Sequence, residues 1–256
     1  MKIILATVYA VNPYKGSEDG MGWNAVYQIA RFNKVIAITR ENNQPNIEKY
    51  QSEHPDPVYK NMQFLYFDLP KWMRFWKKKS RGAMLYYWMW QKAMPNFILK
   101  QNIKYDIVHN LNFHNDWTPS YLYKLEAPFV WGPIGHHPKI PLQYLKPYKM
   151  KYFISDRLTW IIKGLFWNFS LGLHSSINHA KHIFCMNSSV SKVLPVEKEK
   201  CSIVPSVATE DYGCNSEMKH EKFTIISAGR LVPLKGFDLS IAAFADFISN
   251  EKNYEH

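Results

Sequence analysis

Seven short runs rich in β-branched and aromatic residues recur along the first 205 residues, and stretches with helical patterning separate them. Strands that alternate with helices form a parallel sheet whose two faces are covered by those helices. We therefore expect an α/β fold built on a Rossmann-like parallel sheet. The strands are expected at residues 2–8, 34–39, 63–67, 106–109, 129–131, 182–186 and 202–204.

The intervening helical patterns lie at 19–31, 44–53, 83–100 and 117–125, and a long helix is expected within 154–180. In that long helix the apolar stretch LTWIIKGLFWNFSLGL is interrupted by Lys163 and Asn168. It is too short to span a bilayer. We interpret it as a core helix, with a position at a membrane interface as the alternative.

The composition changes near residue 205, where PSVATEDYGCNSEMKHE is polar and rich in turn-forming residues, and a new strand is expected at KFTIISAGR. We expect an N-terminal Rossmann-like domain at 1–205, a linker at 206–221, and the first strand and helix of a second Rossmann-like domain at 222–256. One strand and one helix cannot bury both faces of the strand. The sequence therefore indicates an incomplete second domain and a truncated chain.

The chain carries 32 Lys and Arg against 21 Asp and Glu, a formal charge of +11, which favours anionic partners. Its three cysteines never occur as CxxC, which is typical of a reducing compartment and argues against a structural zinc site. The apolar start MKIILATVYAV is shorter than a membrane span and lacks a secretory cleavage site. We expect a cytoplasmic protein.

Basic residues alternate with aromatic ones over residues 71–94, and most densely between Lys71 and Trp90. Three interpretations fit this pattern: a helix with one basic, solvated face and one aromatic core face, contact with an anionic membrane surface, or stacking on single-stranded nucleic acid. No nucleic-acid-binding signature accompanies the patch, so no nucleic-acid partner is expected. A peripheral position at the membrane is the functional alternative to the plain helix.

Residues 16–25, GSEDGMGWNA, contain a match to the dinucleotide-binding pattern in GMGWNA, and Glu41 follows the second strand. That fingerprint turns directly from strand to helix, whereas here about eleven residues separate Val8 from Gly20. No Gly-Lys-Ser/Thr follows, so the pattern is not a Walker loop. An NAD(P)-dependent oxidoreductase is therefore the less favoured alternative.

The same stretch connects the first strand to the first helix at the carboxyl edge of the expected sheet, where open α/β sheets bind ligands. Its glycines allow a ligand to approach the backbone, and the helix that starts at Asp19 or Gly20 presents N–H groups. Asp19 is expected to complement the helix dipole. Glu18 is expected to precede the helix and to accept hydrogen bonds from ligand hydroxyls.

The segment SAGRLVPLKGFDLSIAAF, residues 227–244, resembles the opening strand, loop and helix of the donor domain in retaining glycosyltransferases of family 4, which have the GT-B architecture. In that family the equivalents of Arg230 and Lys235 hold the diphosphate of a nucleotide sugar. A transferase without a metal needs such cations for its leaving group. The resemblance implies this role for Arg230 and Lys235 and no metal or other cofactor; the alternative is that both are surface charges around a proline turn.

The N-terminal segments GSEDGMGWN, VIAITREN and FVWGPIG are similar to the acceptor-side domain of the same family. GPIG is expected to be a flexible turn after the fifth strand, and the His136-His137-Pro138 that follows departs from the further glycines of other members. The resemblance implies that the acceptor side of the cleft is lined by Gly16, Ser17, Glu18, Gly20, Gly22, Gly132, Gly135 and His136.

Histidines are frequent in DIVHNLNFHNDW, where His109 is expected to end a strand and His114 to begin a loop. In the family a histidine after this strand lies near the transferred sugar, so the resemblance implies His109 as the first catalytic candidate and His114 as the second. A structural role is the alternative for each. A zinc site formed by these histidines with His136 and His137 is not expected, because no metal-ligand spacing is met.

The resemblance implies transfer of a hexose from a nucleotide diphosphate sugar to a glycan or lipid-linked acceptor, with retention at the anomeric carbon, as in polysaccharide biosynthesis. The family's donor domain also carries two glutamates separated by seven residues, and the chain ends before that region. The alternative function is a non-catalytic fragment that binds an acceptor or a membrane.

Overall fold

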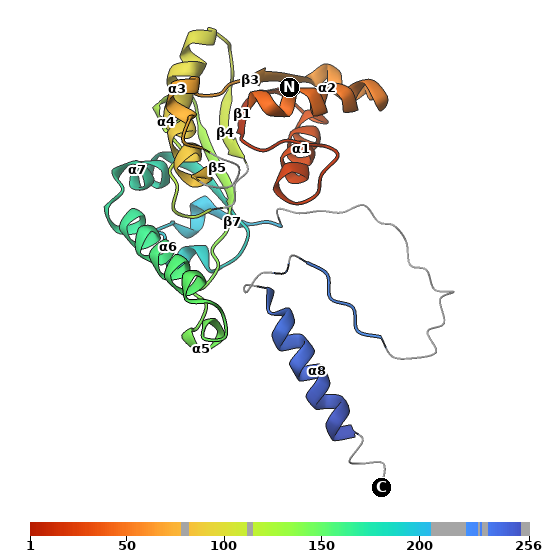
Figure 1. The fold of residues 1–256 in the computed structure, drawn as a ribbon. Coiled ribbons are helices and arrows are strands. Elements are labelled where there is room, and N and C mark those ends of the chain that lie inside the picture. The colour runs from red at the N-terminus through yellow and green to blue at the C-terminus, as the bar shows by residue number, and fades with distance from the viewer. Residues whose placement is uncertain (78–81, 112–114, 206–223, 230, 232–234, 252–256) are drawn as a thin grey trace. The chain divides into compact units, whose positions relative to one another are not determined.

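The computed structural model describes residues 1–77, 82–111, 115–205, 224–229, 231 and 235–251 (Figure 1). Contacts within the chain divide it into two units. The sheet unit comprises Met1–His137 with Lys163–Thr209, and the C-terminal unit comprises Pro138–Ile162 with Glu210–His256. The expected linker at 206–221 lies outside the described residues, so the predicted domain boundaries stay predictions.

The sheet unit contains a seven-stranded sheet in which all pairs are parallel, with the order β3-β2-β1-β4-β5-β6-β7. The predicted α/β, Rossmann-like fold class is confirmed, and each of the seven expected strands overlaps an observed one. The strands are β1 (Ile3–Val8), β2 (Lys34–Thr39), β3 (Met62–Tyr66), β4 (Ile107–Leu111), β5 (Phe129–Ile134), β6 (Ala180–Cys185) and β7 (Cys201–Ile203).

The helices alternate with these strands, as the sequence predicts. The α-helices are α1 (Ser17–Ala30), α2 (Gln44–Glu53), α3 (Lys71–Arg74), α4 (Ala83–Gln101), α5 (Leu142–Leu145), α6 (Met150–Phe169), α7 (Leu171–His179) and α8 (Phe237–Glu251). Short 3₁₀ turns lie at Glu41–Asn43, Pro57–Asn61, Leu122–Lys124, Val190–Lys192 and Lys198–Lys200.

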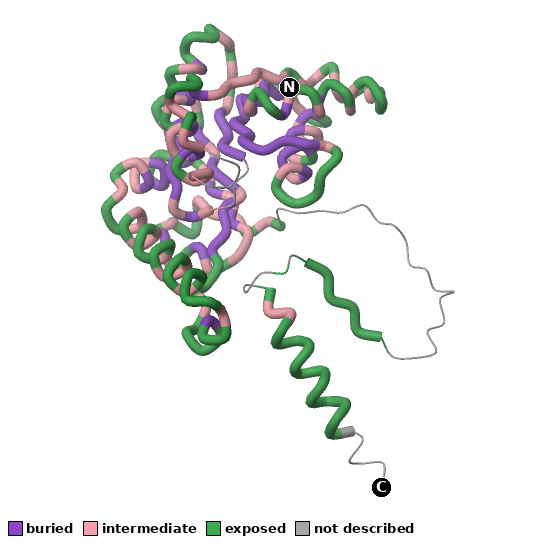
Figure 2. Tube along the Cα trace, in the orientation of Figure 1, coloured by how far each residue is buried: buried purple, intermediate pink, exposed green. Residues whose placement is uncertain are grey.

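Two hydrophobic cores cover the two faces of the sheet, because successive strand residues point to opposite faces. On one face, Ala6 and Val8 of β1 pack with Trp23 and Val26 of α1. On the other face, strand residues such as Leu5 pack with the buried sides of α4 and α7. The buried segments accordingly concentrate along the strands and on the inner sides of these helices (Figure 2).

The predicted helix at 117–125 is wrong: its only helical turn is the 3₁₀ segment Leu122–Lys124. The proline at position 119 disfavours the helical conformation of the residue before it. In addition, the Asn115 side chain accepts a hydrogen bond from the Thr118 backbone N–H at 2.8 Å, which stabilises a turn instead.

The long helix expected within 154–180 is observed as two helices, α6 and α7. Ser170 separates them and caps α7 by accepting a hydrogen bond from the Leu173 N–H at 3.3 Å. The interpretation of LTWIIKGLFWNFSLGL as a core helix is wrong for its part in α6, none of whose twenty residues is buried. Its end lies in α7, where Leu173 is a buried core residue. Apolar side chains such as Ile154, Leu158 and Ile161 are exposed.

The described part of the C-terminal unit contains α5, the first part of α6, and α8. The strand expected at KFTIISAGR is not observed at 224–229, where the described residues are exposed. A strand forms by hydrogen bonding to a neighbour. Within the described ranges, no strand pairs with this segment.

No helix among the described residues combines the length and the apolar character needed to cross a bilayer.

Candidate functional site

The carboxyl ends of the parallel strands meet at one edge of the sheet, which is where ligands bind in open α/β folds. The segments that leave this edge are the loop from β1 to α1, the turns after β2 and β3, and the segments after β4 and β5. Of the residues that the sequence proposed for the acceptor side, Gly16, Gly135 and His136 lie on these segments. The others lie on α1 (Ser17, Glu18, Gly20 and Gly22) or within β5 (Gly132).

The loop between β1 and α1 is closed by Asn12. Its N–H donates to the Asp19 carbonyl at 2.9 Å, and its own carbonyl accepts from the Lys15 N–H at 3.2 Å. Helix α1 begins at Ser17, whose φ of 58° turns the chain into the helix. The expectation that Glu18 precedes the helix is therefore wrong: Glu18 and Asp19 are both acids of the first turn, where they complement the helix dipole.

Glu18 is nevertheless exposed at the sheet edge. The pKa of the Tyr87 hydroxyl on α4 is raised mainly by burial, and the negative charge of Glu18 raises it further. The Glu18 charge is therefore near enough to the buried Tyr87 of α4 to affect its pKa.

The glycines at the end of this loop and at the start of α1 have different structural roles. A Cβ on Gly20 would lie 2.3 Å from the Lys15 carbonyl oxygen, so Gly20 allows the loop to pack against the helix. A Cβ on Gly16 would meet nothing within 4 Å. Gly22 is buried on α1. Only Gly16 combines an exposed position with free space at the edge.

The prediction of a flexible turn at GPIG is wrong for its first three residues, because β5 continues to Ile134. Gly132 has a φ of 119°, and a Cβ there would lie 2.3 Å from the Phe184 carbonyl oxygen of β6. A Cβ on Gly135 would lie 2.8 Å from the Met186 sulfur. These glycines allow β5 and β6 to approach closely at a register shift between the strands.

His109 lies within β4, which continues to Leu111, so the expectation that it ends the strand is wrong. Its Nε2 donates to the Gly132 carbonyl at 2.9 Å, and burial lowers its pKa to about 4. His109 is therefore neutral near pH 7. It lies at a pocket of about 300 Å³ that is also lined by Met21 and Ala25 of α1. His114 lies outside the described residues.

His136 follows β5 and forms a buried pair with Asp116. The two side chains are 8% and 2% exposed, and Nδ1 lies 2.6 Å from the carboxylate. Since a carboxylate accepts, Nδ1 carries a proton, which leaves Nε2 as the basic nitrogen of the neutral ring. Asn187 donates to the His136 carbonyl at 3.0 Å, and the Trp167 indole donates to the Asp116 carbonyl at 3.2 Å.

The residues proposed from the sequence include His136 but not Asp116. The pair resembles the base-and-orienting-carboxylate arrangement that recurs in enzymes that move protons. The sequence shows an aspartate in FHNDW, after the fourth strand, and this was the one feature that could have predicted Asp116 as a site residue. The sequence does not indicate that this aspartate contacts a histidine twenty residues later.

Of the two residues proposed to hold the donor diphosphate, Arg230 lies outside the described residues. Lys235 lies in the C-terminal unit, two residues before α8.

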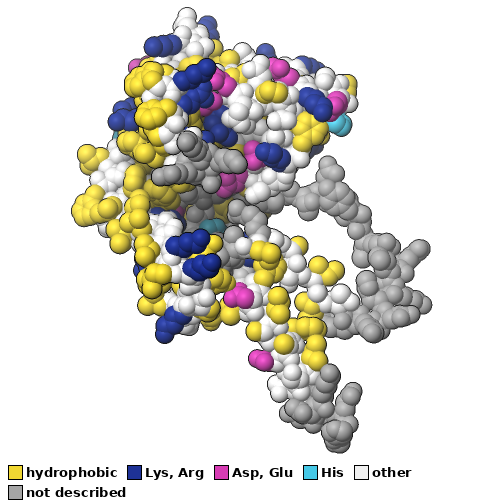
Figure 3. Space-filling model, viewed as in Figure 1, with side chains coloured by type: hydrophobic (Ala, Val, Ile, Leu, Met, Phe, Trp, Pro, Cys, Tyr) yellow, Lys and Arg dark blue, Asp and Glu magenta, His cyan; other side chains and the backbone are white. Residues whose placement is uncertain are grey.

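The basic and aromatic patch at Lys71–Trp90 is divided by the fold. Tyr86, Tyr87 and Trp90 are buried core residues of α4, whereas Trp72 and Phe75 are 74% and 78% exposed. Residues 78–81 lie outside the described part. Figure 3 shows hydrophobic side chains beside Lys and Arg over the region of α3 and α4.

Across the described ranges, no three His, Cys, Asp or Glu side chains gather in a way that would hold a metal ion. No protein-family model matches the chain, and none of the curated proteins searched matches it.

Proposed function

We propose that the chain belongs to a retaining glycosyltransferase of the GT-B type, which transfers a hexose from a nucleotide diphosphate sugar to a glycan or lipid-linked acceptor. The sheet unit is the acceptor-side domain, and the segment around α8 begins the donor-binding domain. One combination of features carries the proposal: a seven-stranded parallel sheet followed along the chain by GRLVPLKG.

In this proposal Arg230 and Lys235 bind the donor diphosphate and compensate the charge that develops on the leaving group. No metal or other cofactor is required. Gly16, Ser17 and Glu18 line the acceptor side of the cleft.

The buried His136–Asp116 pair supports a role for His136 in positioning the acceptor hydroxyl, because Asp116 fixes the tautomer and the orientation of the ring. His109 has a different role. Its Nε2 proton is committed to the Gly132 carbonyl and its pKa is low, so it acts as a neutral group that shapes the site rather than as an acid.

We place the protein in the cytoplasm, at the membrane surface. The exposed Trp72 and Phe75, beside basic residues, support contact with anionic lipid, which would bring the sheet edge near a membrane-bound acceptor.

Calorimetric titration of the full chain with uridine and guanosine diphosphate sugars, followed by NMR detection of sugar release, tests the proposal. We expect binding of at least one donor, and Lys235→Gln should weaken it about tenfold or more, since a charge-assisted contact is lost. Lys198→Gln, at an exposed lysine of the sheet unit, is the control.

Two results would redirect the assignment. Binding of an acceptor or lipid without turnover of any nucleotide sugar would indicate a binding fragment. Thermal stabilisation by NAD(H) or NADP(H), with no response to nucleotide sugars, would indicate an oxidoreductase.

A further inference from the structure

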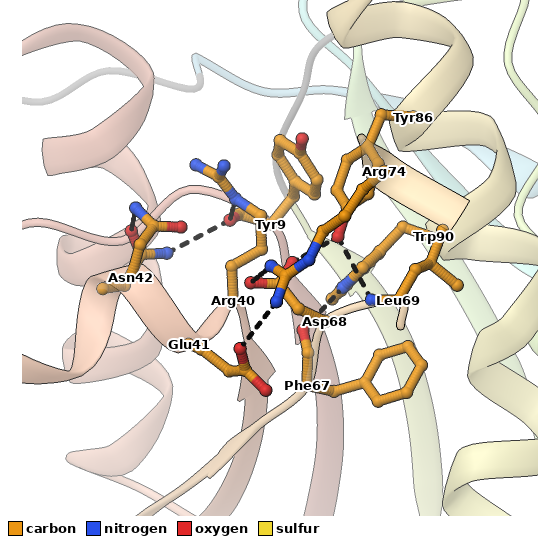
Figure 4. Close-up of polar contacts among 11 residues, drawn as sticks. Tyr9, Arg40, Glu41, Asn42, Phe67, Asp68, Leu69, Arg74, Tyr86 and Trp90 are labelled. Carbon is orange, nitrogen blue, oxygen red and sulfur yellow. Dashed lines mark hydrogen bonds and ion pairs between the residues drawn. The ribbon is translucent and has the colours of Figure 1, made fainter. Parts of the chain in front are cut away.

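A cluster of charged side chains and tyrosines lies at the carboxyl edge of β1, β2 and β3. Tyr9 and Arg40 directly follow β1 and β2, and Asp68 lies two residues after β3. Arg74 from α3 and Tyr86 from α4 complete the cluster (Figure 4). The three strand ends are adjacent because β1 pairs with β2 and β2 pairs with β3.

The two carboxylates of this cluster are held by Arg74. Its guanidinium lies 3.0 Å from Asp68 and 3.3 Å from Glu41. Asp68, whose side chain is 5% exposed, also accepts the hydroxyl proton of Tyr86, and the Tyr86 oxygen accepts the Leu69 N–H at 3.2 Å. Arg74 and its two acids therefore carry a net charge of −1, and together they fix the β3 end to α3 and α4.

Arg40 is held differently, by neutral groups. Its Nε donates to the Tyr9 carbonyl at 3.2 Å, and its guanidinium lies 4.2 Å from the centre of the Tyr9 ring. No ion pair joins Arg40 to a carboxylate in the described part of the chain. Its two terminal nitrogens point away from that carbonyl in Figure 4. The guanidinium is thus oriented in advance and its charge is not neutralised by a described acid.

Lys77 adds a second cation to this edge. Its ammonium lies 5.1 Å from the centre of the Tyr86 ring. Burial lowers its pKa, and the positive charges of Arg40 and Arg74 lower it further, while Asp68 acts in the opposite direction. The Tyr86 ring centre lies 6.3 Å from that of Tyr9, the ring that Arg40 contacts, so Lys77 and Arg40 each lie over one of two neighbouring rings.

We propose that Arg40 and Lys77 form a subsite for a phosphate group of the acceptor. The inference rests on the proposed function and specifies its substrate class: an acceptor that carries a phosphate monoester or diester. A guanidinium fork matches phosphate oxygens, a lysine supplies a point charge, and the carboxyl edge is where such a ligand approaches.

The alternative is that the cations only stabilise the fold. Arg74 fits that role, because it joins two carboxylates from different segments. Arg40 does not, because its partner carbonyl also accepts from Asn43 at 3.2 Å and stays satisfied without it. Arg40 should therefore be replaceable with little loss of stability and with loss of anion binding.

Thermal melting of the full chain in increasing inorganic phosphate, at constant ionic strength, tests this subsite. We expect phosphate to raise the Tm of the unmodified protein, and Arg40→Gln and Lys77→Gln to weaken the apparent phosphate affinity about tenfold or more. Lys34→Gln is the matched control, since Lys34 is exposed at the opposite end of β2 and its replacement removes the same charge. Equal loss in all three variants, or no response to phosphate, would overturn the inference.

Phosphate also resembles part of the donor, so Lys235→Gln is measured in parallel. If phosphate still raises the Tm of the Lys235→Gln variant, the result supports the acceptor subsite. If the variant no longer responds to phosphate, the result overturns the subsite. Circular dichroism checks that each variant is folded. If Arg40→Gln does not fold, Lys77→Gln still tests the subsite.

Vesicles of phosphatidylcholine with and without phosphatidate distinguish a lipid phosphate from a soluble one. Either source supports the subsite provided that Arg40→Gln reduces the binding. Phosphate binding without any turnover of nucleotide sugars contradicts the proposed function alone, whereas transfer to acceptors regardless of phosphate contradicts only this subsite.

Discussion

The buried imidazole of His109 ties the stability of the sheet unit to pH. Its folded pKa of about 4 lies below the ordinary value of 6.5, so between these values the unfolded chain binds a proton that the folded chain does not. The stabilisation is present above pH 6.5 and is lost as the pH falls toward 4. Between pH 7 and pH 5 we expect a loss of about 2 kcal/mol from this residue.

Urea unfolding at the two pH values measures this loss, and His109→Gln should reduce it by about that amount because glutamine does not titrate. An unaltered pH dependence in the His109 variant would show that the ring is more accessible than its 9% exposure indicates.

The His136–Asp116 pair gives a prediction about activity. Asp116→Asn keeps the shape but removes the charge that fixes the Nδ1 proton, so we expect the transfer rate to fall about 10²-fold or more, with donor binding unchanged. Initial rates across pH 6–9 and donor titrations measure the two effects. His137→Ala, at the exposed neighbouring histidine, should keep the unmodified rate, and a similar fall there would refute a specific role for the pair.

Two glycines at the start of α1 separate packing from function: Gly16 is the N-cap of the helix and Gly20 lies in its first turns. Gly20→Ala should destabilise the protein by about 2 kcal/mol, because its Cβ would lie 2.3 Å from the Lys15 carbonyl oxygen. Gly16→Ala should change stability by less than about 0.5 kcal/mol, because the added atom meets nothing within 4 Å. Chemical denaturation of both variants checks the contrast, and equal losses would mean that the loop is packed differently.

Because a side chain at Gly16 meets free space, this position also tests the acceptor side of the cleft. Gly16→Leu should lower transfer while nucleotide sugar binding is kept, since the larger side chain occupies the edge and not the donor segment. Steady-state rates and calorimetric donor titration distinguish the two. A parallel loss of both would assign this loop to the donor phosphate instead.

The strands were predictable because a short apolar run between two helical patterns is typical of a buried strand, and residues 34–39 were predicted with the observed bounds. The failures lie where tertiary structure or a local hydrogen bond decides. Pro119 and Asn115 replace the helix at 117–125 with turns. Gly132 stays within β5 because β6 approaches its backbone, which no pattern in GPIG reveals.

The candidate site was only partly predictable, since it depends on which strand ends meet. The resemblance to a family predicted the glycines and His136 as site residues. Because each of them follows or ends a predicted strand, the sequence also predicted the edge of the sheet at which they lie. Arg40, Asp68 and Arg74 could not be predicted as neighbours from the sequence. They belong to different segments and come together only through the strand order β3-β2-β1. Their types are also common on surfaces, so composition alone does not single them out.

The charged cluster next to the phosphate subsite and the exposed aromatic residues share one element of the molecule. Helix α3 carries Arg74 of the charged cluster together with Trp72, and Phe75 follows at its C-cap. An aromatic pair that enters the headgroup region would bring the edge of β1, β2 and β3 toward lipid phosphates. The same orientation of the protein would then allow both membrane contact and the selection of a phosphate-bearing acceptor.

This arrangement predicts that binding to vesicles depends on both aromatic and electrostatic contact. Replacement of Trp72 and Phe75 by serine should lower co-sedimentation with vesicles containing phosphatidylglycerol about tenfold, and raised salt should weaken binding of the unmodified protein. Phe32→Ser is the matched control, because Phe32 is 69% exposed at the end of α1, away from the patch. Vesicle binding that does not depend on anionic lipid or salt would contradict a specific membrane surface at α3. An equal loss of binding in the control would also contradict it, because any exposed aromatic residue would then be enough for vesicle binding.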